Sequence, residues 1–222
     1  MLSRLTRWWY RRRTASAAMR AYLEAPLPGR NDDARTVEYL AVDLETTGLN
    51  PARDVIVSIG WVPILGGRIR MKQARHLFLA IDGSVAQSAT IHHIRDSDLT
   101  DGGSEAEALR HMLRALHGRV LLVHHAPMDL RFLHAACRRH CDVPLHTRVV
   151  DTLALAHARR SRGNQQPQEG ELRLHALREA YNLPRYPVHD ALTDALATAE
   201  LLLAMLPRWA GDAPLPLKTL LR

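Results

Sequence analysis

Hydrophobic and polar positions along the chain predict several strands first and strand–helix alternation afterwards. Apolar runs at 37–42 and 55–64 indicate buried strands, and a third strand is expected over 68–80, after the Gly66-Gly67 turn. Strands in this succession form an antiparallel meander. The later elements are expected to be a helix at 105–116, a strand at 119–124, a helix at 128–141, a short strand at 149–152, and helices at 171–181 and 189–206. This order predicts an α/β sandwich with a mixed sheet.

The first 25 residues form a separate basic segment. Leu5, Trp8 and Trp9 alternate with arginines in a pattern that predicts one amphipathic helix over residues 1–24. Three roles are open for this helix: packing on the domain, contact with nucleic acid or an acidic partner, and attachment to a membrane surface. Packing is the preferred interpretation, and the helix would then contact the domain through Leu5, Trp8 and Trp9.

Turn-forming and polar residues divide the rest of the chain. The stretch at 26–36, which contains PLPGRNDDAR, predicts a linker before a main domain at 37–206. Residues 207–222 are expected to form a loosely attached C-terminal tail. Inside the main domain, the polar stretch at 159–170 is of low complexity and predicts a loop.

Composition and charge limit the functional classes. The net charge of +7 and the pI near 10.1 favour a polyanionic partner. No apolar run reaches the ~20 residues of a membrane span, and the N-terminus lacks the pattern of a secretory signal. The two cysteines, Cys137 and Cys141, are expected to be reduced, buried thiols, which fits a cytoplasmic protein.

The sequence DLETTGL at 43–49 directly follows the first apolar run. Side chains alternate along a strand, so Asp43 and Glu45 are expected to project to the same side. Carboxylates this close raise each other's pKa unless a cation lies between them, and Mg²⁺ takes oxygen ligands of this kind. An isolated Asp-X-Glu is more often a solvated turn. The interpretation therefore depends on further carboxylates elsewhere in the chain.

Two later motifs supply these carboxylates. HHAPMD at 124–129 lies where a buried strand meets a helix, a position that suits ligand contacts. HDALTD at 189–194 begins the final helix, with His189 and Asp194 five residues apart. Because that spacing is about one and a half turns, the two side chains meet only if His189 lies in or before the first turn.

Other polar residues near these motifs are expected to be structural. Asp151 and Asp190 suit helix caps or groups that support the ligands. His92 and His93 are expected at the surface or in packing contacts. His124 could serve the core or the site, and a core role is favoured.

The three motifs, Asp-X-Glu-Thr-Thr-Gly, His-X-Ala-X-X-Asp and His-X-X-X-X-Asp, together resemble the DEDDh (DnaQ-like) family of 3′-to-5′ exonucleases. This family includes proofreading subunits of the DNA polymerase III epsilon type, RNase T and oligoribonuclease. The resemblance extends over roughly residues 37–206. It implies an RNase H-like fold, here with an N-terminal helical arm added, and hydrolysis of phosphodiesters.

Matched by position, the resemblance also implies a catalytic set. Four carboxylates would hold two divalent cations, Mg²⁺ or Mn²⁺, which stabilise the attacking and leaving oxygens. His189 would be the general base, since the histidine pKa of ~6.5 lies near working pH. The implied metal ligands are Asp43, Glu45, Asp129 and Asp194.

The resemblance further implies contacts with the terminal nucleotide. Thr46 and Thr47 match positions near its sugar, and Leu49 matches a position against its base. His125 and Met128 are implied substrate contacts as well, but both depart from the family, which usually has Asn at the first position and often an aromatic residue at the second. These departures affect the nucleotide contacts and leave the metal chemistry unchanged.

The implied function is a metal-dependent 3′-to-5′ exonuclease that releases nucleoside monophosphates, with single-stranded DNA as the first choice of substrate. Two alternatives stay open: an exoribonuclease acting on RNA 3′ ends or short oligoribonucleotides, and a non-catalytic polymerase accessory module. The presence of all five catalytic residue types favours an enzyme. A DNA polymerase or another replication or repair protein is a candidate partner.

Overall fold

A mixed sheet forms the centre of the computed structural model, which describes residues 4–80, 102–162, 168, 170–187, 189–210 and 213–222. Within these residues the sheet has the strand order β3-β2-β1-β5-β6, with β4 also paired to β2. The first four strands pair antiparallel, whereas β1, β5 and β6 run parallel. The strands are β1 (Tyr39–Thr46), β2 (Ile56–Leu65), β3 (Arg68–Ile69), β4 (Arg75–Phe78), β5 (Val120–Val123) and β6 (Val149–Asp151).

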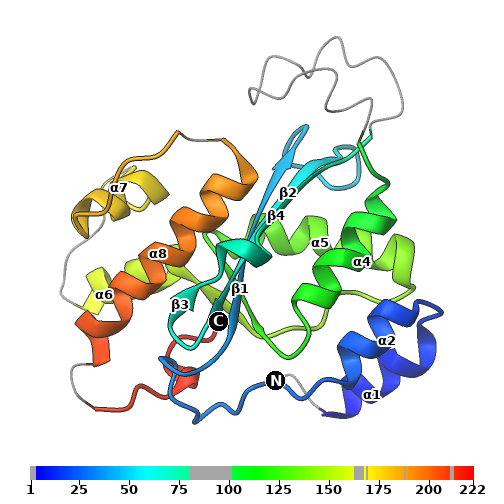
Figure 1. The fold of residues 1–222 in the computed structure, drawn as a ribbon, viewed down its shortest axis with the longest axis horizontal. Helices are drawn as coiled ribbons and strands as arrows, with labels where there is room; N and C mark the ends of the chain where they lie inside the picture. Colours follow the sequence, from blue (N-terminus) through cyan, green and yellow to red (C-terminus); the bar gives the residue numbers. More distant parts are fainter. Residues whose placement is uncertain (1–3, 81–101, 163–167, 169, 188, 211–212) are drawn as a thin grey trace.

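Helices cover both faces of this sheet (Figure 1). On one face lie α4 (Glu105–Ala115) and α5 (Ala126–Cys141), and on the other lies α8 (Ala191–Ala210), with α6 (Thr152–Arg162) and α7 (Leu174–Ala180) beside it. The mixed sheet flanked by helices that the sequence predicts is therefore confirmed. Among the residues that the structure describes, no helix combines the length and the apolar character that a membrane-spanning segment needs.

Side-chain alternation along β1 decides which face carries the acidic residues. Leu40 and Val42 belong to the core under α4 and α5, and Tyr39 and Ala41 to the core under α8. Because the period of a strand is two, the next odd-numbered position, Asp43, continues the face that is turned toward α8. The hydrophobic pattern of β1 therefore places the side chain of Asp43 on the face of the sheet that α8 covers.

The N-terminal segment differs from the single helix predicted for residues 1–24. It contains two helices, α1 (Arg4–Arg13) and α2 (Ala17–Glu24), and Ser16 caps the second by accepting a hydrogen bond from the backbone N–H of Met19. Arg7 of α1 fixes the two helices relative to each other and to the domain, because its guanidinium donates to the backbone oxygens of Tyr22, Ala25 and His146. The expected single helix is wrong because Ser16 caps a second helix, and Arg7 bonds the first helix to the end of the second.

The segment packs on the domain, as preferred from the sequence, but through a different set of side chains. Leu5 is 76% exposed, and Trp8 and Trp9 are about half exposed, so the expected contacts are wrong. The guanidiniums of Arg12 and Arg13 instead lie 4.5 Å from the centres of these two indole rings. Besides Arg7, the buried contacts are the apolar side chains of Met19, Tyr22 and Leu23 on α2.

Several element boundaries also differ from the prediction. The strand expected at 68–80 is two short strands separated by a 3₁₀ turn, η1 (Met71–Gln73), because the backbone at Arg70 leaves the extended conformation. The loop expected at 159–170 is in part helical, since α6 continues to Arg162. The final helix begins at Ala191, not 189, and continues past 206 through Pro207. His92 and His93 lie outside the described residues.

The C-terminal residues are not loosely attached, contrary to the expectation for the tail. Leu217 and Leu220 are buried in the core under α8. The backbone N–H of Ala34 donates to the oxygen of Leu215, and that of Lys218 to the oxygen of Arg30. The segment expected to be a linker and the segment expected to be a tail therefore hold each other against the sheet.

Candidate active site

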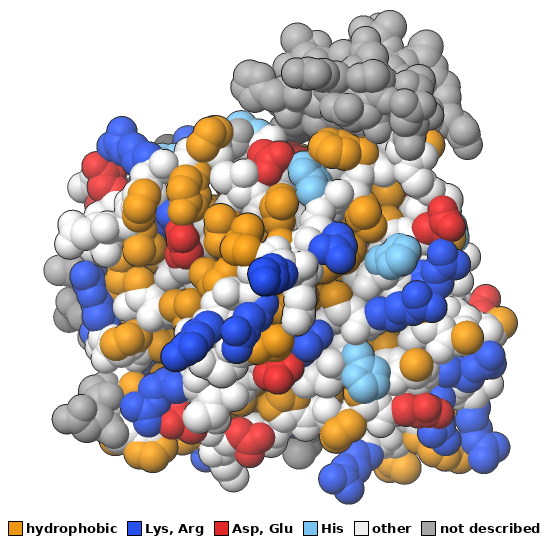
Figure 2. Space-filling model, in the orientation of Figure 1, with side chains coloured by type: hydrophobic (Ala, Val, Ile, Leu, Met, Phe, Trp, Pro, Cys, Tyr) orange, Lys and Arg blue, Asp and Glu red, His pale blue; other side chains and the backbone are white. Residues whose placement is uncertain are grey.

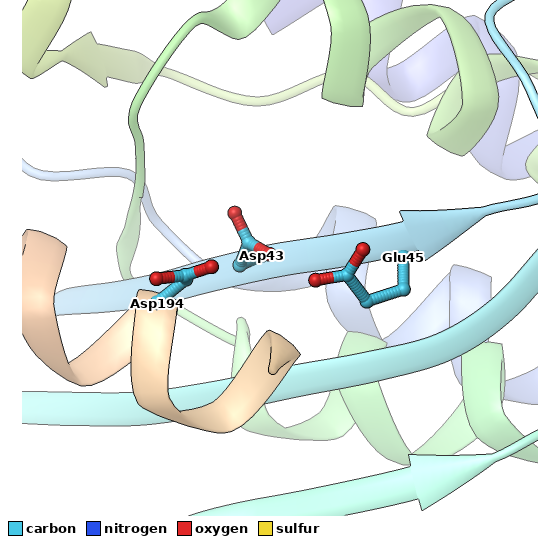
Figure 3. Close-up of side chains that lie close together, drawn as sticks. All are labelled: Asp43, Glu45 and Asp194. Carbon is cyan, nitrogen blue, oxygen red and sulfur yellow. The ribbon is translucent and has the colours of Figure 1, made fainter. Parts of the chain in front are cut away.

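Three carboxylates converge where β1 meets the first turn of α8. Asp43 and Glu45 project from β1, and Asp194 approaches them from the helix (Figure 3). Each can offer one oxygen such that the three oxygens lie within 4.8 Å of one another. Strand alternation and helix placement thus bring together residues that are about 150 positions apart in the sequence.

Asp129 belongs to the same electrostatic cluster. It lies buried in the first turn of α5 and raises the pKa of Asp43, second only to the effect of burial. Burial, Asp151 and Glu45 in turn raise the pKa of Asp129 to about 8. The four carboxylates predicted from the motifs therefore interact, although Asp129 is not part of the tight group of three.

Burial and mutual repulsion raise the pKa values of these carboxyl groups. The pKa of Asp43 lies well above its usual range, through burial first and then through Asp129 and Asp194. Burial and the charge of Asp194 raise the pKa of Glu45 to about 7. Carboxylates that repel one another in this way are stabilised in the charged form by a cation. Because the donor atoms are all oxygens, the residues fit a hard divalent cation such as Mg²⁺ or Mn²⁺.

His189 lies just before α8, beside Asp194. It has a positive φ of 68°, and its backbone N–H donates to Oδ2 of Asp194 at 3.0 Å. A histidine tolerates this left-handed conformation better than a β-branched residue does. Its side chain is exposed and lines the same cleft as Asp43 and Asp194.

The start of α8 is fixed against β2 by a close approach at Gly60. A Cβ added to Gly60 would lie only 2.2 Å from the backbone carbon of Ala191 and the backbone nitrogen of Leu192. Only glycine permits such contact between strand and helix. The position of Asp194, three residues further along the helix, therefore depends on a residue that contributes no side chain.

Asp190 and Asp151 act as helix caps, as expected. Oδ1 of Asp190 accepts a hydrogen bond from the N–H of Thr193 at 2.8 Å. Asp151 is buried, and its oxygens accept the N–H groups of His125 and Ala126 at the start of α5 and of Leu153 and Ala154 at the start of α6. Both aspartates thereby set the positions of helices that carry predicted site residues.

His76 is a contact of the site that the sequence motifs do not reveal. Its Nδ1 lies 3.5 Å from Oδ2 of Asp190, and its Nε2 lies 3.2 Å from Oγ of Ser58. Burial lowers the pKa of His76, and Asp190 opposes that effect. The pair links β4 to the start of α8. Neither the spacing of the motifs nor the hydrophobic pattern predicts the contact between His76 and Asp190. By contrast, a glycine in the middle of a strand, such as Gly60, is a sequence signal for a close approach of another backbone.

The residues predicted to contact the terminal nucleotide differ in their exposure. The hydroxyl of Thr46 donates to the backbone oxygen of Gly48, and that of Thr47 accepts the N–H of Val55, so both hold the loop after β1. Leu49 is 72% exposed at that loop. His125 is exposed and lines the cleft, while Met128 packs against the core.

The cleft beside the carboxylates has a volume of about 1020 Å³ and extends toward α7. Its walls include Arg173, Arg185 and Tyr186, besides the acidic residues. His124 also lines it, but its two ring nitrogens lie 2.7 Å from the hydroxyl of Thr152 and 3.0 Å from the backbone oxygen of Leu172. Burial lowers the pKa of His124 to about 4, so the favoured core role agrees with the structure.

Comparison with known proteins identifies the family. A family model described as an exonuclease matches residues 40–202. The chain is also 32% identical over 178 residues to the DNA polymerase III subunit epsilon of Treponema pallidum, across 78% of this chain and 79% of that protein. The chain belongs to the exonuclease family.

A longer relative also matches most of this chain. The PolC-type DNA polymerase III of Thermotoga maritima is 30% identical over 169 residues, which make up 74% of this chain but only 12% of that protein. This chain therefore corresponds to a small part of the PolC-type protein.

Solved structures agree on the fold. Exonuclease X in complex with 5′ overhanging duplex DNA has a TM-score of 0.59 at 21% identity, covering 82% of this chain and 98% of that one. The nuclease domain of 3′hExo, a DEDDh family member bound to rAMP, has a TM-score of 0.66 at 13% identity, covering 80% and 95%. The predicted RNase H-like fold is confirmed, and with the family match so is the predicted enzyme class, a 3′-to-5′ exonuclease.

Proposed function

We propose that this enzyme removes nucleoside monophosphates from the 3′ ends of single-stranded DNA. The observation that carries the proposal is the meeting of Asp43, Glu45 and Asp194 at a cleft that His189 also lines. The choice of DNA is supported by the relatives, which are named as DNA polymerase III proteins. A net charge of +7 is compatible with a polyanionic substrate, and Lys and Arg side chains are spread over the face of the molecule shown in Figure 2.

Asp43, Glu45, Asp129 and Asp194 would hold two divalent cations, Mg²⁺ or Mn²⁺, which when bound stabilise developing charge on the phosphate and lower the pKa of water. The chain's own contribution to proton transfer is His189. A neutral ring nitrogen of this residue would accept the proton of the attacking water. Because the side chain is exposed at the cleft, the proton can then pass to solvent.

The hydrogen bond from the N–H of His189 to Asp194 holds the base beside a metal ligand. A general base needs a fixed position as well as a suitable pKa, because it must lie within hydrogen-bond reach of the water. His76 and Asp190 would support this position by fixing the start of α8.

The substrate strand would be held by the walls of the cleft. Arg173 and Arg185 are exposed there and would contact phosphates. Leu49 offers an exposed apolar side chain against the terminal base, with Thr46 and Thr47 near its sugar. His125 and Met128 complete the proposed contacts, as the resemblance implies.

The test is a degradation assay on 5′-labelled single-stranded DNA, duplex DNA and short RNA, read by product length with Mg²⁺ or Mn²⁺. We expect single-nucleotide shortening from the 3′ end, silenced by chelator and restored by added metal. Asp43→Asn should abolish cleavage, whereas Glu24→Gln, an equal change of charge on an exposed residue, should not. Full activity of the wild type in excess chelator contradicts the proposal.

The same assay decides between substrates and partners. Faster shortening of RNA than of DNA would support the exoribonuclease alternative, for which the rAMP-bound neighbour offers a precedent. A polymerase partner is proposed because one relative is named as a DNA polymerase III subunit, and co-elution with a purified bacterial polymerase subunit would test it. The cytoplasmic location stays a prediction.

A further inference from the structure

A second cavity lies at the β6 edge of the sheet and is lined by arginines. Its volume is about 440 Å³, and its walls include Arg30, Arg148 and Arg222 together with the apolar side chains of Leu130 and Leu221. None of the catalytic carboxylates lines it. Among the described residues, no acidic side chain lines it at all.

The backbone around this arginine pocket is well fixed, although its members come from distant parts of the chain. The backbone oxygen of Arg30 accepts the N–H of Lys218 at 2.7 Å, and the N–H of Arg222 donates to the oxygen of Val149 at 3.1 Å. The oxygen of Arg148 accepts the N–H of Leu121 at 2.9 Å. The three arginines are therefore held at one place by the sheet and by the C-terminal residues.

Arg148 has donors without acceptors. Its Nε and Nη1 atoms are buried and have no hydrogen-bond partner among the described residues. A guanidinium stays charged and carries five N–H donors, so leaving some of them buried and unpaired is costly. A ligand with several acceptor oxygens would remove that cost.

The surrounding charges also favour an anion. Burial, and next the charge of Arg30, lowers the pKa of Arg148, while Asp32 opposes this effect. Oδ2 of Asp32 already accepts the N–H of Gly29 at 2.6 Å. Arg222 lies 3.6 Å from Asp151, a carboxylate that already accepts four backbone N–H groups, and its own side chain is 45% exposed at the pocket.

We propose that the arginine pocket binds a phosphate group. Guanidinium groups form paired, charge-assisted hydrogen bonds with phosphate oxygens, and the volume lies within the range of small-ligand sites. The phosphate can belong to a free nucleotide or inorganic phosphate, or to the backbone of a nucleic acid strand. This site is separate from the catalytic cleft, and the inference does not depend on the proposed hydrolysis.

The experiment is titration of inorganic phosphate into the full chain, in chelator and at constant ionic strength with chloride, followed by calorimetry and by thermal unfolding. We expect saturable binding and a rise in Tm. Arg148→Gln should weaken binding roughly tenfold or more, because charge-assisted hydrogen bonds are lost. The control Arg110→Gln removes an equal charge from an exposed residue of α4 and should leave binding unchanged.

Two further arms keep the test decisive. Arg222→Gln, at the rim, covers the case in which the Arg148 variant fails to fold, and it should also weaken phosphate binding. A short thymidine oligonucleotide, measured in chelator, distinguishes the two sources. If Arg148→Gln weakens binding of the oligonucleotide, the pocket binds a strand phosphate. If Arg148→Gln weakens binding only of inorganic phosphate or thymidine monophosphate, the pocket binds a free ligand. Absence of saturable phosphate binding, or equal binding by the wild type and both pocket variants, overturns the proposal.

Discussion

Replacing Gly60 with Ala should damage both stability and catalysis, because Gly60 sets the distance between β2 and α8. The new Cβ would lie 2.2 Å from the backbone of Ala191, whereas ordinary contacts begin near 3.4 Å. The start of the helix must therefore move by roughly 1 Å, since backbone cannot rotate away. Overpacking of this kind costs about 1–3 kcal/mol.

The same shift would displace Asp194 and the proposed general base, His189, which lies just before α8. Metal ligands tolerate distance errors of only about 0.2 Å, and a misplacement of ~1 Å in an active site can lower turnover ~100-fold. We expect Tm to fall by about 2–12 °C, at ~2–4 °C for each kcal/mol in a protein of this size. Turnover, measured well below that Tm, should fall about 100-fold.

The assay compares Gly60→Ala with Gly103→Ala, whose added Cβ would meet no heavy atom within 4 Å. Thermal unfolding and single-turnover cleavage of a labelled strand are measured for both. The control should resemble the wild type in each measurement. Wild-type Tm and turnover in Gly60→Ala would refute the idea that this contact positions Asp194.

Three further outcomes are expected. His189→Ala should lower turnover by about 10²–10⁴-fold in the cleavage assay, because the positioned general base is lost. Deleting residues 1–25 should lower Tm, since it exposes the core that α2 covers, and should leave metal-dependent cleavage in place. The metal-free protein should lose stability as pH rises from about 4 to 8, because the folded state binds protons more tightly at Glu45 and Asp129, whose pKa values rise to about 7 and 8. Unfolding by urea across this range checks the sign.

The fold could be predicted where hydrophobic alternation is regular. The apolar runs that became β1, β2 and β5 are almost wholly buried, so pattern and structure agree there. The prediction failed where one local interaction outweighs the pattern. Ser16 divides the N-terminal segment by capping a new helix, and its residue type was a visible signal. Arg7 was not visible, because a buried arginine and an exposed one look alike in sequence.

The candidate site was predicted through motif order, but its geometry was not. The five-residue spacing could not predict whether His189 and Asp194 face the same cleft, because this depends on the positive φ at His189. The roles of Asp151 and Asp190 as caps followed from residue type and position. The contact of His76 with Asp190 joins strands and helices far apart in the chain, and a single sequence carries no signal for it.

The carboxylate cluster is held together by residues outside the cluster, which position the strand and helices that carry it. Asp43, Glu45 and Asp194 repel one another, so in the absence of a cation the site opposes folding at neutral pH. Gly60 lets α8 approach β2 closely, and the caps at Asp151 and Asp190 fix the starts of the helices, so the carboxylates stay together despite that repulsion. A bound divalent cation would relieve it instead, and binding to the folded state alone raises stability. Metal affinity and fold stability should therefore change together in variants of these supporting residues.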